Sequence, residues 1–208
     1  MNKIALSVVI PVYNGETFLR DCLASVLAEA NDLSSEIGLS EIVCVDDASS
    51  DRSVEIISAD FASVTLVCNN YNRGFAYTCN LGMRESRGEF IFLLNQDTRL
   101  KKGALKSLYG RLQLDQKIAF VGPRFVGFDG ELQRKCASFP TFGNVFWKMV
   151  GMSRIFPESK RFANLGMGWF DHLSEFRVDQ PMGAALMFRR DILNKVGYLD
   201  ESFPIYFN

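Results

Sequence analysis

Four short clusters in this 208-residue sequence contain polar side chains that could bind a ligand. Each cluster follows an apolar run. The clusters are Pro11-Val12-Tyr13-Asn14, Asp46-Asp47, the segment from Asn69 to Gly74, and Asn95-Gln96-Asp97-Thr98. Carboxylates accept hydrogen bonds, amides both donate and accept them, and arginine donates them to anions. Together these side chains could hold a polar ligand.

Each cluster also has a purely structural interpretation. Asn14, Ser50 and Asp51 are favourable helix N-caps, and an Asp-Thr pair after a strand often forms a turn. The shared position of the clusters nevertheless favours function for the set. In an open parallel sheet, ligands bind outside the carboxyl ends of the strands, where loops present side chains without disturbing the core.

Alternating strand and helix patterns predict the elements that position these clusters. The apolar, β-branched run from Ile4 to Val12 predicts a strand, and the spacing of Phe18 to Leu27 predicts a helix after it. Further strands are expected at 42–45, 64–68, 90–94 and 119–121, with helical stripes between them at 54–61, 75–83 and 105–112. This alternation indicates an α/β fold, a mostly parallel sheet with helices on both faces.

The pattern changes beyond Pro123. Phe128 to Glu131 carries a hairpin turn signal, and Gln133 to Gln180 shows no sustained period, so we expect substrate contacts there rather than core. Strand character returns from Met182 to Phe188, and Asp191 to Val196 suits one short helix.

Composition excludes several classes of function. The net charge of -1 and the pI near 5.9 argue against a nucleic-acid partner. No apolar run approaches the roughly 18 residues of a spanning helix, so we expect a cytoplasmic protein, with a peripheral contact at the inner face of a membrane left open. The five cysteines follow no CxxC spacing and suit reduced, buried thiols. The single histidine, His172, excludes a multi-histidine metal site and is expected at the surface.

The ordered motifs of the sequence resemble those of the inverting family 2 glycosyltransferases, and within that family bacterial rhamnosyltransferases. The motifs are the segment from Ser7 to Asn14, Val45 to Asp51, Asn72 to Ala76 with Asn80, and Leu94 to Thr98. The resemblance implies a GT-A, Rossmann-like fold. It also implies that residues 1–122 are the nucleotide-sugar-binding half and that residues 123–208 are the acceptor-side part of the same domain.

The resemblance further implies roles for individual residues. Pro11 and Tyr13, with Asn14 beside them, would frame the nucleoside, and Asp47, next to Asp46, would accept a hydrogen bond from the pyrimidine N–H. The residues expected near the base and diphosphate are Asn72, Arg73, Gly74, Asn80, Asn95 and Gln96, although Arg73 could equally be an exposed loop arginine. Asp97 matches the last carboxylate of the DxD metal motif, and a structural role is its alternative. On the acceptor side the resemblance implies Met182, Gly183 and Ala184.

The implied reaction moves a sugar from a UDP- or dTDP-sugar to a hydroxyl of a glycan or lipid-linked acceptor, as in bacterial polysaccharide biosynthesis. Mg²⁺ or Mn²⁺ would stabilise the leaving diphosphate. The general base is expected just after Asn208, so no catalytic base is expected within the sequence. A non-catalytic sugar-nucleotide-binding or assembly module and a sugar nucleotidyltransferase are the alternatives, and a homodimer stays open. The nucleotidyltransferase would need a glycine-rich phosphate loop, and Gly166-Met167-Gly168 lacks the third glycine.

Overall fold

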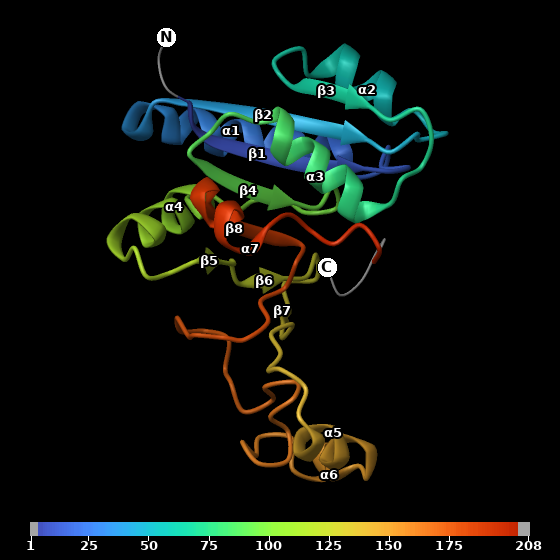
Figure 1. Cartoon of the computed structure of the whole chain (residues 1–208). Helices are drawn as coiled ribbons and strands as arrows, with labels where there is room; N and C mark the ends of the chain where they lie inside the picture. The colour runs from blue at the N-terminus through green and yellow to red at the C-terminus, as the bar shows by residue number, and fades with distance from the viewer. Residues whose placement is uncertain (1–3, 204–208) are drawn as a thin grey trace. The chain divides into compact units, whose positions relative to one another are not determined.

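The computed structural model describes residues 4–203, which are divided between two compact units (Figure 1). The first unit is built from segments 1–121 and 184–208, and the second from Gly122–Gly183. The expected second half of the chain, residues 123–208, is therefore shared between the units, because the chain returns to the first unit at Ala184. The segment 204–208, which precedes the expected position of the base, lies outside the described residues.

A six-stranded sheet forms the centre of the first unit (Figure 1). In spatial order its strands are β3 (Thr65–Cys68), β2 (Leu39–Asp46), β1 (Ile4–Val12), β4 (Phe90–Leu94), β8 (Ala185–Arg189) and β5 (Phe120–Val121). β3, β2, β1 and β4 run parallel, whereas β8 is antiparallel to its neighbours β4 and β5. The predicted α/β fold with a mostly parallel sheet is confirmed.

Helices connect the parallel strands and cover both faces of the sheet. They are α1 (Leu19–Ile37), α2 (Ser53–Asp60), α3 (Phe75–Glu85) and α4 (Ala104–Leu114), followed after β8 by the 3-10 turn η1 (Arg190–Ile192) and α7 (Leu193–Val196). Figure 1 shows α3 and α7 on one face and α1 on the other. Because β1 to β4 run parallel, connected by these helices, they all end at the same edge of the sheet.

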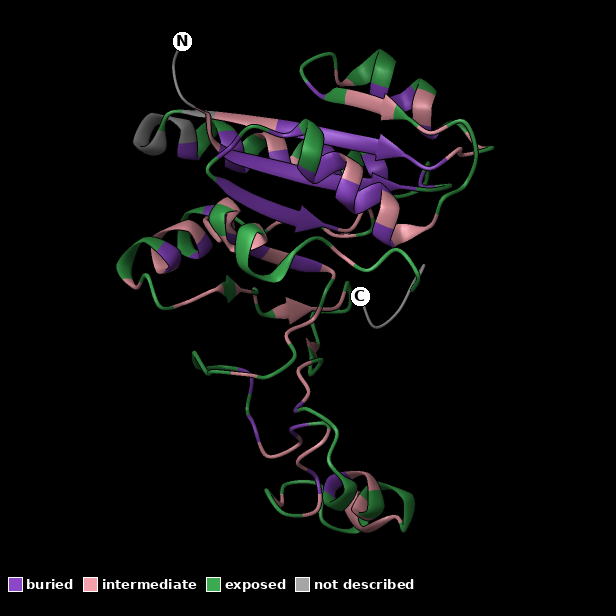
Figure 2. Ribbon diagram, viewed as in Figure 1, coloured by how far each residue is buried: buried purple, intermediate pink, exposed green. Residues whose placement is uncertain are grey.

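The core lies around β1 and β4, whose residues are buried on both faces (Figure 2). Alternate residues of a strand point to opposite faces. Val9 of β1 and Ile91 and Leu93 of β4 therefore pack together on one face with Cys79 and Met83 of α3. This packing holds the strand ends, and the loops that follow them, in fixed positions.

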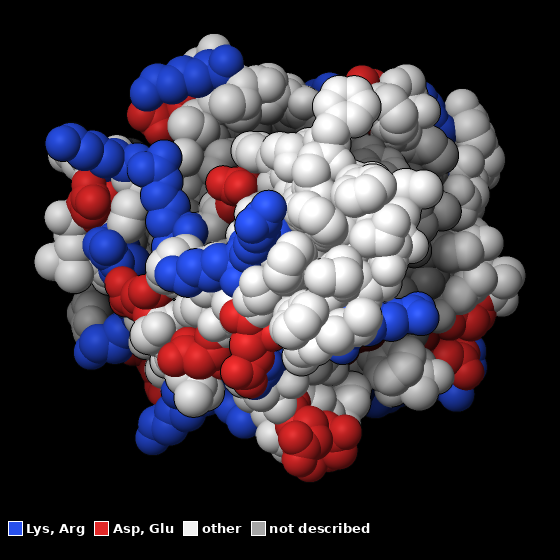
Figure 3. Space-filling model, turned by 90° about the horizontal axis from the view of Figure 1, so that it is seen from below, with Lys and Arg blue, Asp and Glu red and all other residues white. Residues whose placement is uncertain are grey.

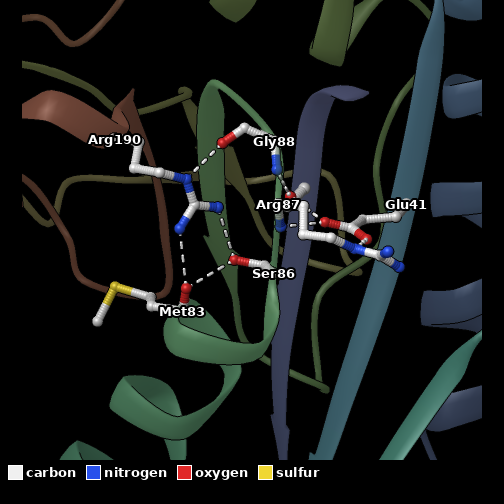
Figure 4. A network of polar contacts seen from close by, with 7 residues as sticks. Glu41, Met83, Ser86, Arg87, Gly88 and Arg190 are labelled. Atoms are coloured by element: carbon white, nitrogen blue, oxygen red, sulfur yellow. Dashed lines mark hydrogen bonds and ion pairs between the residues drawn. The ribbon is translucent and has the colours of Figure 1, made fainter. Parts of the chain in front are cut away.

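A polar network closes the opposite edge of the sheet, where β1 and β4 begin (Figure 4). Arg190 donates hydrogen bonds to the carbonyl oxygens of Gly88 and Met83, at 2.6 and 2.9 Å, and to Ser86 Oγ at 2.8 Å. The Gly88 N–H in turn donates to Ser7 Oγ at 2.7 Å. These bonds secure the connection from α3 to β4, so their role is structural.

The second unit contains more regular structure than its sequence predicts. β6 (Phe125–Val126) and β7 (Leu132–Gln133) form the expected hairpin. The segment from 133 to 180 also contains α5 (Phe142–Met149) and α6 (Met152–Ile155), so the prediction of an unpatterned stretch is wrong there. His172 is buried rather than at the surface, and its Nδ1 lies 2.8 Å from the carbonyl oxygen of Phe170.

Candidate functional site

A pocket of about 290 Å³ lies at the carboxyl ends of β1, β2 and β4, beside the start of α3. The strand order reverses between β1 and β4, and ligands of open α/β sheets bind at such a switch point. The lining residues are Pro11, Val12, Tyr13, Asp47, Asn72, Gly74, Phe75, Thr78, Asn95, Gln96 and Asp97. All of them except Val12, Phe75 and Thr78 are site residues expected from the sequence.

The first turn of α3 supplies two lining residues that sequence reasoning missed. Phe75 and Thr78 are three positions apart and therefore share a face of the helix. The sequence did predict both the helix and the loop before it, so its first turn could have been included. A helix N-terminus carries partial positive charge, which favours an anion at this side of the pocket.

Asp47 holds the loop between β3 and α3. Its side chain is only 4% exposed, and Oδ1 accepts hydrogen bonds from Asn69 Nδ2 and the Arg73 N–H, both at 2.8 Å. Oδ2 accepts from the Gly74 N–H at 2.8 Å. Gly74 has a φ of 86°, a conformation that glycine adopts without strain. A carboxylate has about four lone-pair positions, so Asp47 keeps capacity for about one further donor.

Gln96 connects the loops that follow β1 and β4. Its side-chain Oε1 accepts from the Tyr13 N–H at 3.0 Å, and its Nε2 donates to the Tyr13 carbonyl oxygen at 2.8 Å. The Tyr13 side chain is 49% exposed and is thus available to a ligand. Gln96 therefore positions Tyr13 across the switch point.

The segment from Asn95 to Thr98 forms a turn that presents Asp97. The carbonyl oxygen of Asn95 accepts from the Thr98 N–H at 3.2 Å and from Thr98 Oγ1 at 2.7 Å, and the Asn95 N–H donates to the Ala184 carbonyl oxygen at 2.8 Å. Asp97 is exposed, and its carboxylate makes no hydrogen bond with any other described residue. Of the two carboxylates among the described lining residues, Asp47 and Asp97, only that of Asp97 thus remains free.

Two of the expected donor-binding residues lie beside the pocket and secure its loops. Asn14 Oδ1 accepts from the Ser50 N–H, and the Asn14 N–H donates to Ser49 Oγ, both at 2.9 Å. Asp46 is 2% exposed, and its Oδ2 accepts from the Ser49 N–H at 3.0 Å. Asn14 therefore connects the loops after β1 and β2, Asp46 holds the turn that follows β2, and neither residue lines the pocket.

Arg73 lies outside the pocket lining. Its guanidinium group stacks over the rings of Tyr77, at 3.7 Å from the centroid, and Tyr71, at 5.3 Å. The side chain is exposed, as the alternative interpretation of a loop arginine expects.

Asn80 also lies away from the pocket lining, and its buried amide is fully engaged. Its Nδ2 donates to the Leu199 carbonyl oxygen at 2.9 Å and to Glu201 Oε1 at 2.8 Å, while its Oδ1 accepts from the Leu199 N–H at 3.0 Å. Asn80 thus anchors the segment after α7.

The expected acceptor-side residues lie where the chain passes between the two units. Met182 and Gly183 end the second unit, and Ala184 begins the second segment of the first unit, where its carbonyl oxygen accepts from the Asn95 N–H.

A larger groove of about 460 Å³ lies between α1 and the loop before α4. Its most buried polar side chain is Glu29, which accepts from the N–H groups of Gly103 at 2.8 Å and Leu105 at 3.1 Å. That carboxylate satisfies the first turn of α4, whose N-cap Gly103 has no side chain to do so. The role of Glu29 in this groove is therefore structural, whereas the Asp97 carboxylate in the pocket at the switch point is free.

The mostly parallel sheet, its switch point and the pocket there define an open α/β protein with a ligand pocket at the carboxyl ends of its strands. The sequence pattern of Glycosyl transferase family 2 matches residues 7–197, and the chain belongs to this family.

Several curated proteins are similar to the chain. The hexosyltransferase Agl10 of low-salt glycan biosynthesis from Haloferax volcanii is 23% identical over 206 residues, which cover 97% of this chain and 58% of Agl10. The undecaprenyl-phosphate 4-deoxy-4-formamido-L-arabinose transferase of Pseudomonas paraeruginosa is 38% identical over 96 residues, 44% of this chain and 27% of that protein. Glycosyltransferase GlyG of Streptococcus pneumoniae is 31% identical over 111 residues, 52% of this chain and 35% of GlyG. The chain thus spans at most 58% of these relatives.

Solved structures share the fold. TarS of S. aureus in complex with UDP has a TM-score of 0.61 and 18% identity, over 97% of this chain and 52% of that chain. The mannosyltransferase PcManGT of Pyrobaculum calidifontis, in complex with GDP-Man and Mn²⁺, has a TM-score of 0.58 and 17% identity, over 97% and 49%.

Proposed function

We propose that the pocket binds the nucleoside diphosphate of a sugar donor, and that the protein transfers the sugar with inversion to a hydroxyl of a glycan or lipid-linked acceptor. The observation that carries this proposal is the arrangement of three features around one pocket at the switch point. These are the exposed Tyr13, the free carboxylate of Asp97 and the first turn of α3. TarS binds UDP and PcManGT binds GDP-Man in the same fold, which supports a nucleotide donor.

Each feature suits one part of such a donor. Tyr13 and Pro11 provide flat surfaces for a base, and the remaining acceptor capacity of Asp47 suits the N–H of a pyrimidine, as in a UDP- or dTDP-sugar. The diphosphate would lie at the first turn of α3, where Gly74 lets it approach the backbone. A rhamnosyl donor, as the sequence resemblance implies, is part of this proposal.

The donor set fits a divalent cation shared between protein and substrate. No group of three or more His, Cys, Asp or Glu side chains that could hold a metal occurs within the described part of the chain. Asp97 alone would therefore supply a charged protein ligand, with oxygen atoms of the diphosphate completing a site that suits Mg²⁺ or Mn²⁺. The bound cation would stabilise the charge that develops on the leaving diphosphate.

We assign no general base to the described residues. Asp200 accepts hydrogen bonds from the Ser202 N–H and Oγ, at 2.9 and 2.7 Å, within its own turn. Glu201 pairs with Asn80 at 2.8 Å and with Arg84 at 3.6 Å. These contacts favour a structural role for both carboxylates.

Calorimetric titration of the chain with UDP and dTDP, with Mn²⁺ or with EDTA, tests the proposal. Asp97→Asn should weaken binding about tenfold or more with Mn²⁺ and leave it unchanged in EDTA, since it removes the ionised ligand. The matched control is Glu85→Gln, which removes the same charge at the exposed far end of α3. Failure of both nucleotides to bind, or equal losses for Asp97→Asn with and without metal, would contradict the assignment.

A further inference from the structure

Helix α5 presents its apolar face to solvent. Phe142, Phe146, Met149 and Val150 fall at positions i, i+4, i+7 and i+8 and so share one side of the helical turn. Their exposed fractions are 100%, 53%, 81% and 51%. The buried residue of the helix is instead polar, because Asn144 turns inward and donates to the Phe139 carbonyl oxygen at 2.9 Å. A surface helix normally has the opposite arrangement, with its apolar stripe facing the core.

The apolar surface continues beyond α5. α6 contacts α5, and Ile155 and Phe156 at its end are 66% and 47% exposed. Figure 3 shows one face of the molecule, on which uncharged residues form a broad area with Lys, Arg, Asp and Glu side chains around it. Exposed apolar side chains on two helices in contact mark an interaction surface.

Positive charge accompanies this surface. The segment 139–163 contains Lys148, Arg154, Lys160 and Arg161 against the single anion Glu158, a net charge of +3 in a chain whose total is -1. Two of these cations stack on tryptophans: Lys160 Nζ lies 4.7 Å from the Trp169 ring, and the Arg161 guanidinium lies 5.7 Å from that of Trp147. Exposed apolar side chains, tryptophan and surrounding cations are the composition of segments that lie in a lipid headgroup layer.

We propose that α5, α6 and the cations of segment 139–163 form a docking surface for an anionic lipid membrane. The charge selects this occupant, because two copies related by a two-fold axis would bring the same +3 segments together, whereas anionic headgroups neutralise them. No helix within residues 4–203 is long and apolar enough to cross a membrane. The surface does not involve the donor pocket, and the two proposals hold or fail separately.

Co-sedimentation with vesicles tests the proposal, using phosphatidylcholine alone and phosphatidylcholine mixed with phosphatidylglycerol. The chain should bind the anionic vesicles at least about tenfold more tightly, since each cation near such a surface contributes about fivefold. Phe142→Ser combined with Phe146→Ser should abolish binding, and Lys148→Gln combined with Arg154→Gln, which lowers the net charge of the segment from +3 to +1, should greatly reduce the preference for anionic lipid. Both pairs are exposed, so the fold is retained.

The control pairs Leu114→Ser with Phe128→Ser, each 83% exposed and outside this surface, and should bind like the unaltered chain. UDP titration of every variant should give unchanged affinity. Two results would overturn the proposal: equal binding by the Phe142/Phe146 variant and the control, or a concentration-dependent dimer in sedimentation equilibrium that this variant alone abolishes.

Discussion

Replacing Gly15, which does not line the pocket, by alanine should loosen the backbone of Tyr13, which does. A methyl group at Gly15 would overlap the Gln96 side-chain oxygen and lie 2.7 Å from Gln96 Cδ, so the carboxamide must move. That movement breaks both hydrogen bonds to the Tyr13 backbone, which measure 3.0 and 2.8 Å. Each bond contributes about 0.5–1.5 kcal/mol, so the free energy of unfolding should fall by about 1–3 kcal/mol.

A double-mutant cycle isolates this mechanism. Gln96→Ala loses the same two bonds and should cost a similar amount. In the Gln96→Ala background the methyl group at Gly15 meets no carboxamide, so Gly15→Ala should be neutral or stabilise by about 0.4–1 kcal/mol through the unfolded state. The two substitutions should therefore couple by about 1–4 kcal/mol. Gly110→Ala in α4 is the control, because nothing lies within 4 Å of its added methyl, and it should stabilise the protein.

Urea denaturation of the four cycle members and the control gives the free energies. UDP titration of the same proteins should show weaker binding for Gly15→Ala and for Gln96→Ala, since both release the Tyr13 backbone. Additive stability losses in the double mutant, or a Gly15→Ala protein as stable as the Gly110→Ala control, would refute the reasoning.

Arg190→Lys should destabilise the protein by about 1.5–3 kcal/mol in urea, because lysine cannot reproduce the guanidinium fork, while UDP affinity stays unchanged at the other edge of the sheet. Burial raises the pKa of Cys22 to about 12, so iodoacetamide should label the exposed Cys68 long before Cys22 in the native protein, and label both after unfolding, as mass spectrometry can show. Burial raises the pKa of Asp51, but hydrogen bonds from the Ser53 hydroxyl and from backbone N–H groups lower it by more, so the pKa lies below its usual value of 3.8. The contribution of Asp51 to stability is therefore present above pH 3.8 and is lost as the pH falls through the lowered pKa. Asp51→Asn should make the stability depend less on pH in this acid range, as denaturation curves measured there can show.

The strands of the first unit are largely predictable, because strands buried on both faces read as continuous apolar runs. β1 and β4 have the predicted limits, Ile4–Val12 and Phe90–Leu94. The strand predicted at Met182 to Phe188 begins only at Ala185 and runs antiparallel, and side-chain alternation carries no information on direction. α5 was missed although Phe142, Phe146, Met149 and Val150 recur at helical spacing, and the sequence could not show that this apolar stripe faces solvent while Asn144 faces inward.

The location of the pocket also follows from the sequence, since the polar clusters come directly after predicted strands. The hydrogen-bond partner of each polar side chain does not follow from the sequence. Gln96 reaches the Tyr13 backbone, 83 residues away, and Asn80 reaches Leu199, 119 residues away. Contacts at such separations depend on the packed fold, so one sequence could not show that these amides are already engaged.

The central claim is that this pocket holds a nucleoside diphosphate with a cation bound to Asp97. A crystal structure of the chain grown with UDP and Mn²⁺ tests it most directly, through the nucleotide density and the anomalous signal of the metal. We predict the base between Tyr13 and Asp47, the diphosphate at the first turn of α3, and the Mn²⁺ peak bonded to an oxygen of Asp97. Nucleotide density elsewhere with this pocket empty, or a metal peak remote from Asp97, would contradict the account.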